Sequence, residues 1–276
     1  GAISNYPQHD LRRHESALWA FGEESVNVSN GLQASDFDSL SLPDAGWYVI
    51  RSDDNYMVIQ AGENGSEGWG THAHNDILSF ELLVGQRAFI IDPGSYIYTG
   101  NYRARNMYRG IAAHNTVQID RHETNRIPKK DMFRMSNDAS VTIHEWDTDD
   151  CRTWFDAEYV SPVSAVKNVY HRRKFEYFHD LAYWVISDSA GYLGGDEDEL
   201  SNITMYFHFS HLCVELDGLV ARTCFPDGPN LAVLPLYEDV VGDSSTGIDA
   251  IINTGWVSSR YGVQEKAPIL QYSMLS

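Results

Sequence analysis

From Trp47 onward the chain is a succession of short segments rich in aromatic and β-branched residues, each ended by Gly, Asn, Asp or Pro. Such residues favour extended strands, and no helical pattern separates the segments. Short strands divided by turn residues are typical of antiparallel sandwiches. We therefore predict an all-β fold, a large antiparallel β-sandwich. The expected strands are WYVIR (47–51), NYMVIQA (55–61), ILSFELLV (77–84), RAFIID (87–92), NTVQID (115–120), AEYV (157–160), KFEYF (174–178), LAYWVISD (181–188), ITMYFHFSH (203–211) and LAVLPLY (231–237).

Residues 1–45 differ from the rest of the chain. Residues 10–19 fit one short helix that ends near Gly22, and a polar stretch up to Gly46 is typical of a linker. We expect a short helical and linker tail over 1–45 and one sandwich domain over 46–276. Because the chain opens on Gly1-Ala2 without an initiator Met, we also expect it to be a fragment of a longer protein.

The net charge of the 276 residues is −19 at neutral pH, which opposes nonspecific binding to nucleic acid. Basic residues nevertheless gather at 103–109, at 121–134 and at 172–174, so the domain can still offer a basic patch. The long basic spacer at 121–138 is a candidate active-site loop. No apolar run approaches the ~18 residues of a membrane span, so we expect none.

Three cysteines, Cys151, Cys213 and Cys224, occur without a C-x-x-C pair. A zinc ribbon and a dithiol redox motif are therefore not expected. The odd count leaves at least one thiol unpaired. Whether Cys213 and Cys224 meet across a hairpin stays open at this point.

The residues that carry chemistry lie between Gly70 and Asp120. If the segment is extended, alternate residues share a face, so His72, His74 and Asp76 project together. Asp92 ends an apolar strand at a Pro-Gly turn, and His114 begins another strand. Two histidines and a carboxylate arriving from three strand ends can form a zinc site with one place left for water. Spacing alone leaves a metal site and a hydrogen-bonded structural cluster both open.

The same stretch is similar to the signature region of the heparinase II/III-like domain, which oligoalginate lyases share. The order, the spacing and the glycines match, and weaker likeness extends it to roughly residues 40–210. The matching runs are GTHAHND (70–76), SFEL (79–82), IDPGSY (91–96) and AAHNTV (112–117), with AGWYVIR (45–51), HRR (171–173) and YWVI (183–186) as the weaker ones.

The resemblance implies an amino-terminal (α/α) toroid beside a carboxy-terminal sandwich of the supersandwich type, with substrate in the cleft between them. It implies that His74, Asp92 and His114 bind one structural zinc ion near the cleft. His72, beside that site, would then face the substrate. The missing toroid becomes an expected partner, and without it we expect little or no activity.

The chemistry that the resemblance implies is the β-elimination of uronic-acid-containing glycans. A lyase must neutralise the uronate carboxylate, remove the C5 proton and protonate the leaving oxygen. Imidazole titrates near working pH, so His72 suits proton transfer or neutralisation. A tyrosine assists in some relatives, and the candidates are Tyr98, Tyr102 and Tyr108. Bidentate contacts to the acidic sugar are expected from Arg103, Arg105 and Arg109, unless these are ordinary surface residues.

We therefore predict the carboxy-terminal domain of a polysaccharide lyase that works on an acidic polysaccharide in the periplasm or outside the cell. The alternative is a non-catalytic carbohydrate-binding or exopolysaccharide-assembly module. A hydrolase that uses zinc-bound water is a third interpretation. It is disfavoured because Glu81 lies at odd register to His72 and is expected to point away from the site.

Overall fold

The secondary structure of the described residues is mainly antiparallel strand, which confirms the all-β prediction. The computed structural model describes residues 38–52, 55–85, 87–194, 201–236 and 247–275. Every strand pair assigned within these ranges is antiparallel. The helix expected at 10–19 lies outside the described residues.

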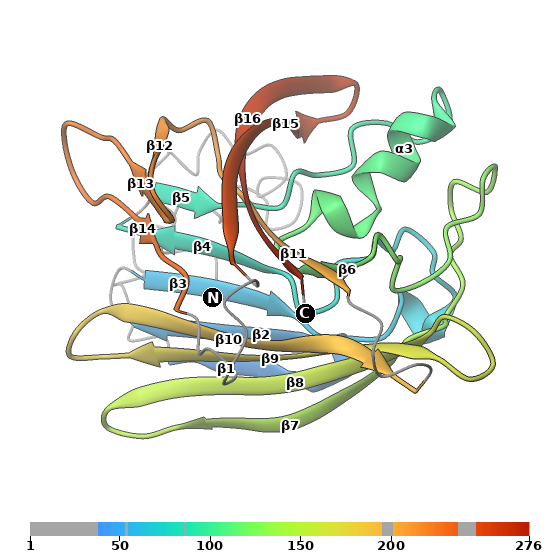
Figure 1. The fold of residues 1–276 in the computed structure, drawn as a ribbon, viewed down its shortest axis with the longest axis horizontal. Coiled ribbons are helices and arrows are strands. Elements are labelled where there is room, and N and C mark those ends of the chain that lie inside the picture. Colours follow the sequence, from blue (N-terminus) through green and yellow to red (C-terminus); the bar gives the residue numbers. More distant parts are fainter. Residues whose placement is uncertain (1–37, 53–54, 86, 195–200, 237–246, 276) are drawn as a thin grey trace, which may run out of the picture.

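The strands form four sheets (Figure 1). The five-stranded sheet has the order β1 (Leu40–Leu42), β2 (Trp47–Ser52), β3 (Asn55–Gln60), β4 (Phe80–Val84) and β5 (Arg87–Ile90). A second sheet has the order β10 (Tyr183–Leu193), β9 (Asn168–Phe178), β8 (Arg152–Pro162) and β7 (Ser140–Thr148). The third runs β15 (Asp249–Arg260), β16 (Val263–Leu275), β11 (Asn202–His208) and β6 (Val117–Ile119). The small sheet contains β12 (Val214–Asp217), β13 (Val220–Thr223) and β14 (Ala232–Val233).

The sandwich begins before the boundary that was expected at residue 46. β1 pairs with β2, with Leu40 opposite Val49, so it belongs to the five-stranded sheet. A short 3-10 turn, Pro43–Ala45, joins the two strands. Gly46 ends this turn at φ 67°, and a Cβ there would lie 2.0 Å from the backbone of Gly62, so only glycine allows the close approach.

Aromatic side chains fill the space between the layers. Tyr48 of β2 stacks on Phe155 of β8 with ring centroids 4.1 Å apart. Phe80 of β4 lies edge-on to Phe175 of β9 at 5.5 Å and to Phe207 of β11 at 6.1 Å. The five-stranded sheet thus packs on the β7–β10 sheet, the lower layer in Figure 1, and also meets the β11 sheet. Each such ring contributes about 1.5–3 kcal/mol through burial.

Asn115 joins two of the sheets behind the candidate site. Its amide donates to the carbonyl oxygens of Phe80 at 2.8 Å and Ile91 at 2.9 Å. Its Oδ1 accepts from the backbone N–H of His208 at 2.6 Å. The side chain is fully buried, and these bonds fix the ends of β4, β5 and β11 relative to one another.

Helical structure in the described residues is limited to a few short segments. The longest is α3 (Tyr102–Tyr108), whose N-cap Asn101 accepts hydrogen bonds from the backbone N–H groups of Arg103 and Ala104. The 3-10 turn η5 (Ile111–Ala113) follows. In the described part of the chain, no helix combines the length and the apolar character that a membrane crossing needs.

Candidate functional site

The segment 70–79 is irregular, so the prediction that His72, His74 and Asp76 alternate along one strand is wrong. Gly70 adopts φ 62°, and a Cβ there would lie 2.4 Å from the carbonyl oxygen of Met135. His72 follows at φ 60°, in the left-handed region. After this turn, His72 is exposed, whereas His74 and Asp76 are partly buried.

His74, Asp92 and His114 do come together, from three different segments. Nδ1 of His114 lies 2.7 Å from Oδ2 of Asp92, and because a carboxylate only accepts, Nδ1 carries the proton. The backbone N–H of Gly94 donates to Oδ1 of Asp92 at 2.7 Å. The imidazole rings of His74 and His114 have centroids 5.2 Å apart. We call these three residues the His–Asp cluster.

Two further carboxylates, those of Asp76 and Glu81, lie near the His–Asp cluster. Burial raises the pKa of Asp76 to about 6, and the charge of Asp92 adds to this. Burial also raises the pKa of Glu81, again reinforced by Asp92. In His114 burial opposes the charged ring, but the charge of Asp92 and its hydrogen bond raise the pKa overall. The Nε2 atom of His114 is buried without a hydrogen-bond partner among the described residues.

Glu81 belongs to the site, contrary to the expectation that it points away. Its carboxylate accepts a hydrogen bond from the backbone N–H of Asp92, and the two carboxylates influence each other. The expectation failed because it extended the alternation of β4 back through His72, and that segment is not a strand. Glu81 is thus a site residue that spacing alone concealed.

The His–Asp cluster has the ligand types of a zinc site, although its candidate ligand atoms do not all lie within 4.8 Å of one another. Nε2 of His74 accepts a hydrogen bond from Nη1 of Arg105 at 2.6 Å. Oγ of Ser95 lies 3.4 Å from the same nitrogen. Burial, reinforced by the neighbouring His114, lowers the pKa of His74 to about 3, so the imidazole is neutral, as a metal ligand must be.

An aromatic face surrounds the exposed His72. The ring centroid of His72 lies 5.9 Å from that of Tyr98 and 5.6 Å from that of Phe133. Tyr98 in turn stacks on Phe133 at 6.0 Å and contacts Tyr261 at 5.8 Å. We call His72, Tyr98, Phe133 and Tyr261 the aromatic face. Sequence reasoning missed Phe133 and Tyr261, since they come from the loop after β6 and the turn between β15 and β16.

The three arginines predicted to bind substrate lie in different environments. Arg103 is exposed beside the ring of Tyr102. Arg105 is buried, packs over Tyr98 at 5.2 Å and donates to His74. Arg109 is also buried, and its guanidinium donates to carbonyl oxygens of the 121–138 loop, among them that of Asp131 at 2.5 Å. Arg109 therefore holds the loop in place, and Arg103 is the arginine directed at solvent.

The tyrosines differ in the same way. Tyr108 is buried, its hydroxyl donates to Gln264 at 3.2 Å, and burial raises its pKa to about 12. Tyr102 is 41% exposed, and its hydroxyl accepts a hydrogen bond from Arg103. Tyr98 is half-buried and contacts His72 directly. Among the three, Tyr98 therefore combines access to solvent with a contact to His72.

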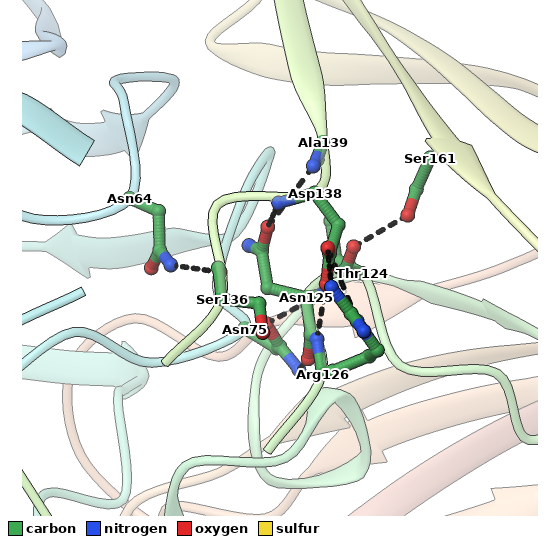
Figure 2. A network of polar contacts seen from close by, with 9 residues as sticks. All are labelled: Asn64, Asn75, Thr124, Asn125, Arg126, Ser136, Asp138, Ala139 and Ser161. Carbon is green, nitrogen blue, oxygen red and sulfur yellow. Dashed lines mark hydrogen bonds and ion pairs between the residues drawn. The ribbon is translucent and has the colours of Figure 1, made fainter. Parts of the chain in front are cut away.

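The 121–138 loop is fixed to the site by a polar network that the sequence did not reveal (Figure 2). The side chain of Asn75 donates to the carbonyl oxygen of Asn125 at 2.9 Å and accepts from its backbone N–H at 3.0 Å. Oδ1 of Asn125 accepts from the N–H groups of Asp138 and Ala139. Arg126 and Asp138 close the loop with an ion pair of 2.8 Å. The loop that carries Phe133 is thus tied to the residue after His74.

The family model of the heparinase II/III-like C-terminal domain matches residues 34–273 of this sequence. The chain belongs to this family. The match includes the His–Asp cluster and the aromatic face, and it begins ahead of β1, in agreement with the start of the sandwich.

Two curated proteins share sequence with the chain. A heparin-sulfate lyase of Pedobacter heparinus is 36% identical over 95 residues, which is 32% of this chain and 14% of that protein. A heparin-sulfate lyase of Bacteroides stercoris is 23% identical over 227 residues, which is 79% of this chain and 29% of that protein.

Solved structures share the fold. A crystal structure of heparan sulfate lyase HepC from Pedobacter heparinus superposes with a TM-score of 0.70 at 22% identity, over 94% of this chain and 38% of that one. A structure titled heparinase III, the BT4657 gene product, gives a TM-score of 0.68 at 19% identity, over 94% of this chain and 39% of that one. The chain therefore spans well under half of each of these relatives.

Proposed function

We propose that this domain forms the sandwich side of the substrate cleft in a lyase that cleaves uronic-acid-containing polysaccharides by β-elimination. The observation that carries the proposal is the exposed His72 within the aromatic face, two residues from His74 of the His–Asp cluster. Sugar rings stack on aromatic faces, and Tyr98 and Phe133 offer such a surface. The relatives named heparin-sulfate lyase support an acidic polysaccharide as the substrate class.

In this proposal Arg103 and residues of the aromatic face have separate roles in the reaction. Arg103 and His72 neutralise the substrate carboxylate, which makes the C5 proton acidic enough to remove. Proton transfer falls to His72 and to a phenol, for which Tyr98 is better placed than Tyr102. A helical toroid domain of the same protein supplies the opposite wall and the remaining groups. The chain alone then has weak activity or none.

The proposed metal is one zinc ion held by His74, Asp92 and His114. The unpartnered Nε2 of His114 and the several partly buried carboxylates around it support a cation at this position. When bound, the ion would supply positive charge and hold the cluster rigid beside the aromatic face. In the metal-free arrangement Arg105 holds His74 through the 2.6 Å hydrogen bond to its Nε2, and a zinc ion bound at that nitrogen would replace this bond.

The proposed location is the periplasm or the cell exterior, where such polysaccharides occur. A second candidate function is a non-catalytic carbohydrate-binding or exopolysaccharide-assembly module. The net charge of −19 favours this candidate, because a strongly acidic domain repels a highly sulfated or carboxylated glycan.

The test is the appearance of unsaturated uronate product, followed by ultraviolet absorbance, when the complete protein that carries this domain is given heparan sulfate or another uronate glycan. We expect His72→Ala to lower kcat/KM by about 10²–10⁴-fold, the range for a lost acid–base group. The matched control is His144→Ala, which alters a histidine on β7 and should leave the rate unchanged. Full activity in His72→Ala, or glycan binding without any product, would favour the binding module.

A further inference from the structure

Cys213 and Cys224 are direct cross-strand partners at the open end of the β12–β13 hairpin. The register pairs Val214 with Thr223, so the next opposed pair is Cys213 and Cys224. The backbone N–H of Cys224 donates to the carbonyl oxygen of Cys213 at 3.1 Å. Opposed residues of this hydrogen-bonded kind have Cα atoms about 5.5 Å apart. That spacing falls in the range of about 5.5–6 Å that disulfides most often span.

The two sulfur atoms are already close and accessible. The Sγ atoms of Cys213 and Cys224 and a carboxylate oxygen of Glu215 all lie within 4.8 Å of one another. Both cysteines are exposed and carry free thiols. Side chains of opposed residues leave the same face of a hairpin, so a bond between the sulfurs requires side-chain rotation and little backbone movement.

We propose that Cys213 and Cys224 form a reversible disulfide that closes the β12–β13 hairpin. The oxidant is a disulfide of the glutathione class. One protein thiolate attacks it and releases one thiolate, forming a mixed disulfide. The second protein thiolate then attacks the protein sulfur of that mixed disulfide and releases the other thiolate. The two cysteines lose two electrons and two protons, and the oxidant becomes two thiols.

The proposed disulfide lies where the β12–β14 sheet contacts β5, the strand that precedes Asp92. Phe225, next to Cys224, packs against the guanidinium of Arg87 at 3.6 Å and edge-on to Phe89 at 6.2 Å. Both partners belong to β5, which ends just before Asp92. Closing the hairpin therefore restrains Phe225 against β5. Cys151, in the exposed turn between β7 and β8, lies outside this arrangement and serves as an internal reference.

The experiment equilibrates the purified chain with mixtures of oxidised and reduced glutathione, blocks the remaining thiols by alkylation and maps peptides by mass spectrometry. We expect a linked 213–224 peptide, formed at an oxidised-to-reduced ratio at least about tenfold lower than the ratio that modifies Cys151, because the second step is intramolecular. The Cys151→Ser variant should form the same link. Cys213→Ser and Cys224→Ser should each abolish it, with melting temperature reporting that the variants remain folded.

Two results would overturn the proposal. One is modification of Cys213 and Cys224 by separate glutathione molecules, at the ratio that modifies Cys151, without a link. The other is a zinc ion that protects both thiols from alkylation and is lost in Cys213→Ser, since the same atoms would then form a metal site with Glu215. The proposal does not depend on lyase activity, so its failure would leave the proposed function untouched.

Discussion

Two pairs of a buried histidine and an aspartate have similar geometry and differ in their surroundings. His114 and Asp92 are 2.7 Å apart in the His–Asp cluster, and His171 and Asp188 are 2.6 Å apart on β9 and β10. Both histidines are fully buried. Within the described residues, each also leaves its second ring nitrogen without a hydrogen-bond partner. An unpartnered nitrogen beside a carboxylate therefore does not by itself mark a metal ligand.

The neighbouring charges separate the two pairs. Arg173 donates to both oxygens of Asp188, and although burial alone would raise the pKa of Asp188, Arg173 and His171 together hold it far below its usual range. In the His–Asp cluster, Arg105 donates to His74, and the hydrogen bonds of Asp92 come from His114 and the backbone N–H of Gly94. The negative charge near His171 and Asp188 is thus balanced by Arg173, whereas, in the described part of the chain, the carboxylates around His114 and Asp92 have no arginine bound to them.

The backbone shows the same contrast. Seven non-glycine residues in the described ranges have positive φ, and all but Ala182 fall between Glu67 and Arg121. His72 and Tyr96 are among those near the site. Left-handed backbone at non-glycine residues costs stability, and it persists where surrounding structure holds it, often at functional sites. Strained backbone is therefore concentrated near the site, whereas the strands of the β7–β10 sheet contain none of these residues.

The largest effect is expected from breaking the neutralised pair. Asp188→Asn leaves the guanidinium of Arg173 buried without its charged partner. We expect the free energy of unfolding to fall by about 3–5 kcal/mol, measured by urea denaturation. Arg172→Ala, which removes a half-exposed guanidinium from its ion pair with buried Asp156 on the same sheet, is the matched control and should cost less. Equal losses in the two variants would contradict the contrast.

The pH dependence follows from the depressed pKa of Asp188. A group whose folded pKa lies below its unfolded value of 3.8 stabilises the protein above that value, and its contribution is lost as the pH falls through the folded pKa. The stability difference between wild type and Asp188→Asn should therefore stay constant near neutral pH and shrink below about pH 4. Melting temperatures measured from neutral to acidic pH test this. A difference that grows toward acid would be inconsistent with it.

A smaller effect is expected at the His–Asp cluster of the metal-free protein. Asp92→Asn keeps an oxygen that can accept from Nδ1 of His114 and removes a negative charge next to Glu81. With a chelator present, we expect a loss of about 1 kcal/mol in unfolding free energy. Added zinc should widen the gap, since only the wild type gains from binding. If Asp92→Asn lost as much unfolding free energy as Asp188→Asn, with or without chelator, the two histidine–aspartate pairs would not differ as described.

The smallest effect is expected at the surface of the loop network in Figure 2. The side chain of Arg126 is 82% exposed, so Arg126→Ala should leave the free energy of unfolding almost unchanged. Asn125 is fully buried, and Asn125→Ala leaves the N–H groups of Asp138 and Ala139 unpaired. That variant should cost about 2 kcal/mol, measured by the same denaturation. The order of the two losses is the testable outcome.

Local sequence was sufficient for much of the fold. Aromatic and β-branched runs such as 47–51 and 55–61 coincide with β2 and β3, because their burial depends on immediate alternation. The long strands β15 and β16 were anticipated only as further sandwich. Most of their residues are not buried, so the apolar alternation that reveals a strand is weak there.

The candidate site was only partly predictable. His74, Asp92 and His114 lie near one another, and the resemblance had already linked their three segments, but their role as metal ligands stays a prediction. The places of Glu81 and Phe133 depend on a turn at 70–79 and on a long loop. Both are fixed by contacts between residues far apart in the chain, which no local pattern records.

The most direct test of the central claim is the zinc content of the chain purified without chelators. The account predicts about one zinc ion per chain, lost in His74→Ala and in Asp92→Ala and retained in the control His171→Ala if that variant remains folded. Absence of metal from the wild type, or its retention in both cluster variants, would contradict the account. The His–Asp cluster would then be a structural hydrogen-bond cluster like the pair formed by His171 and Asp188.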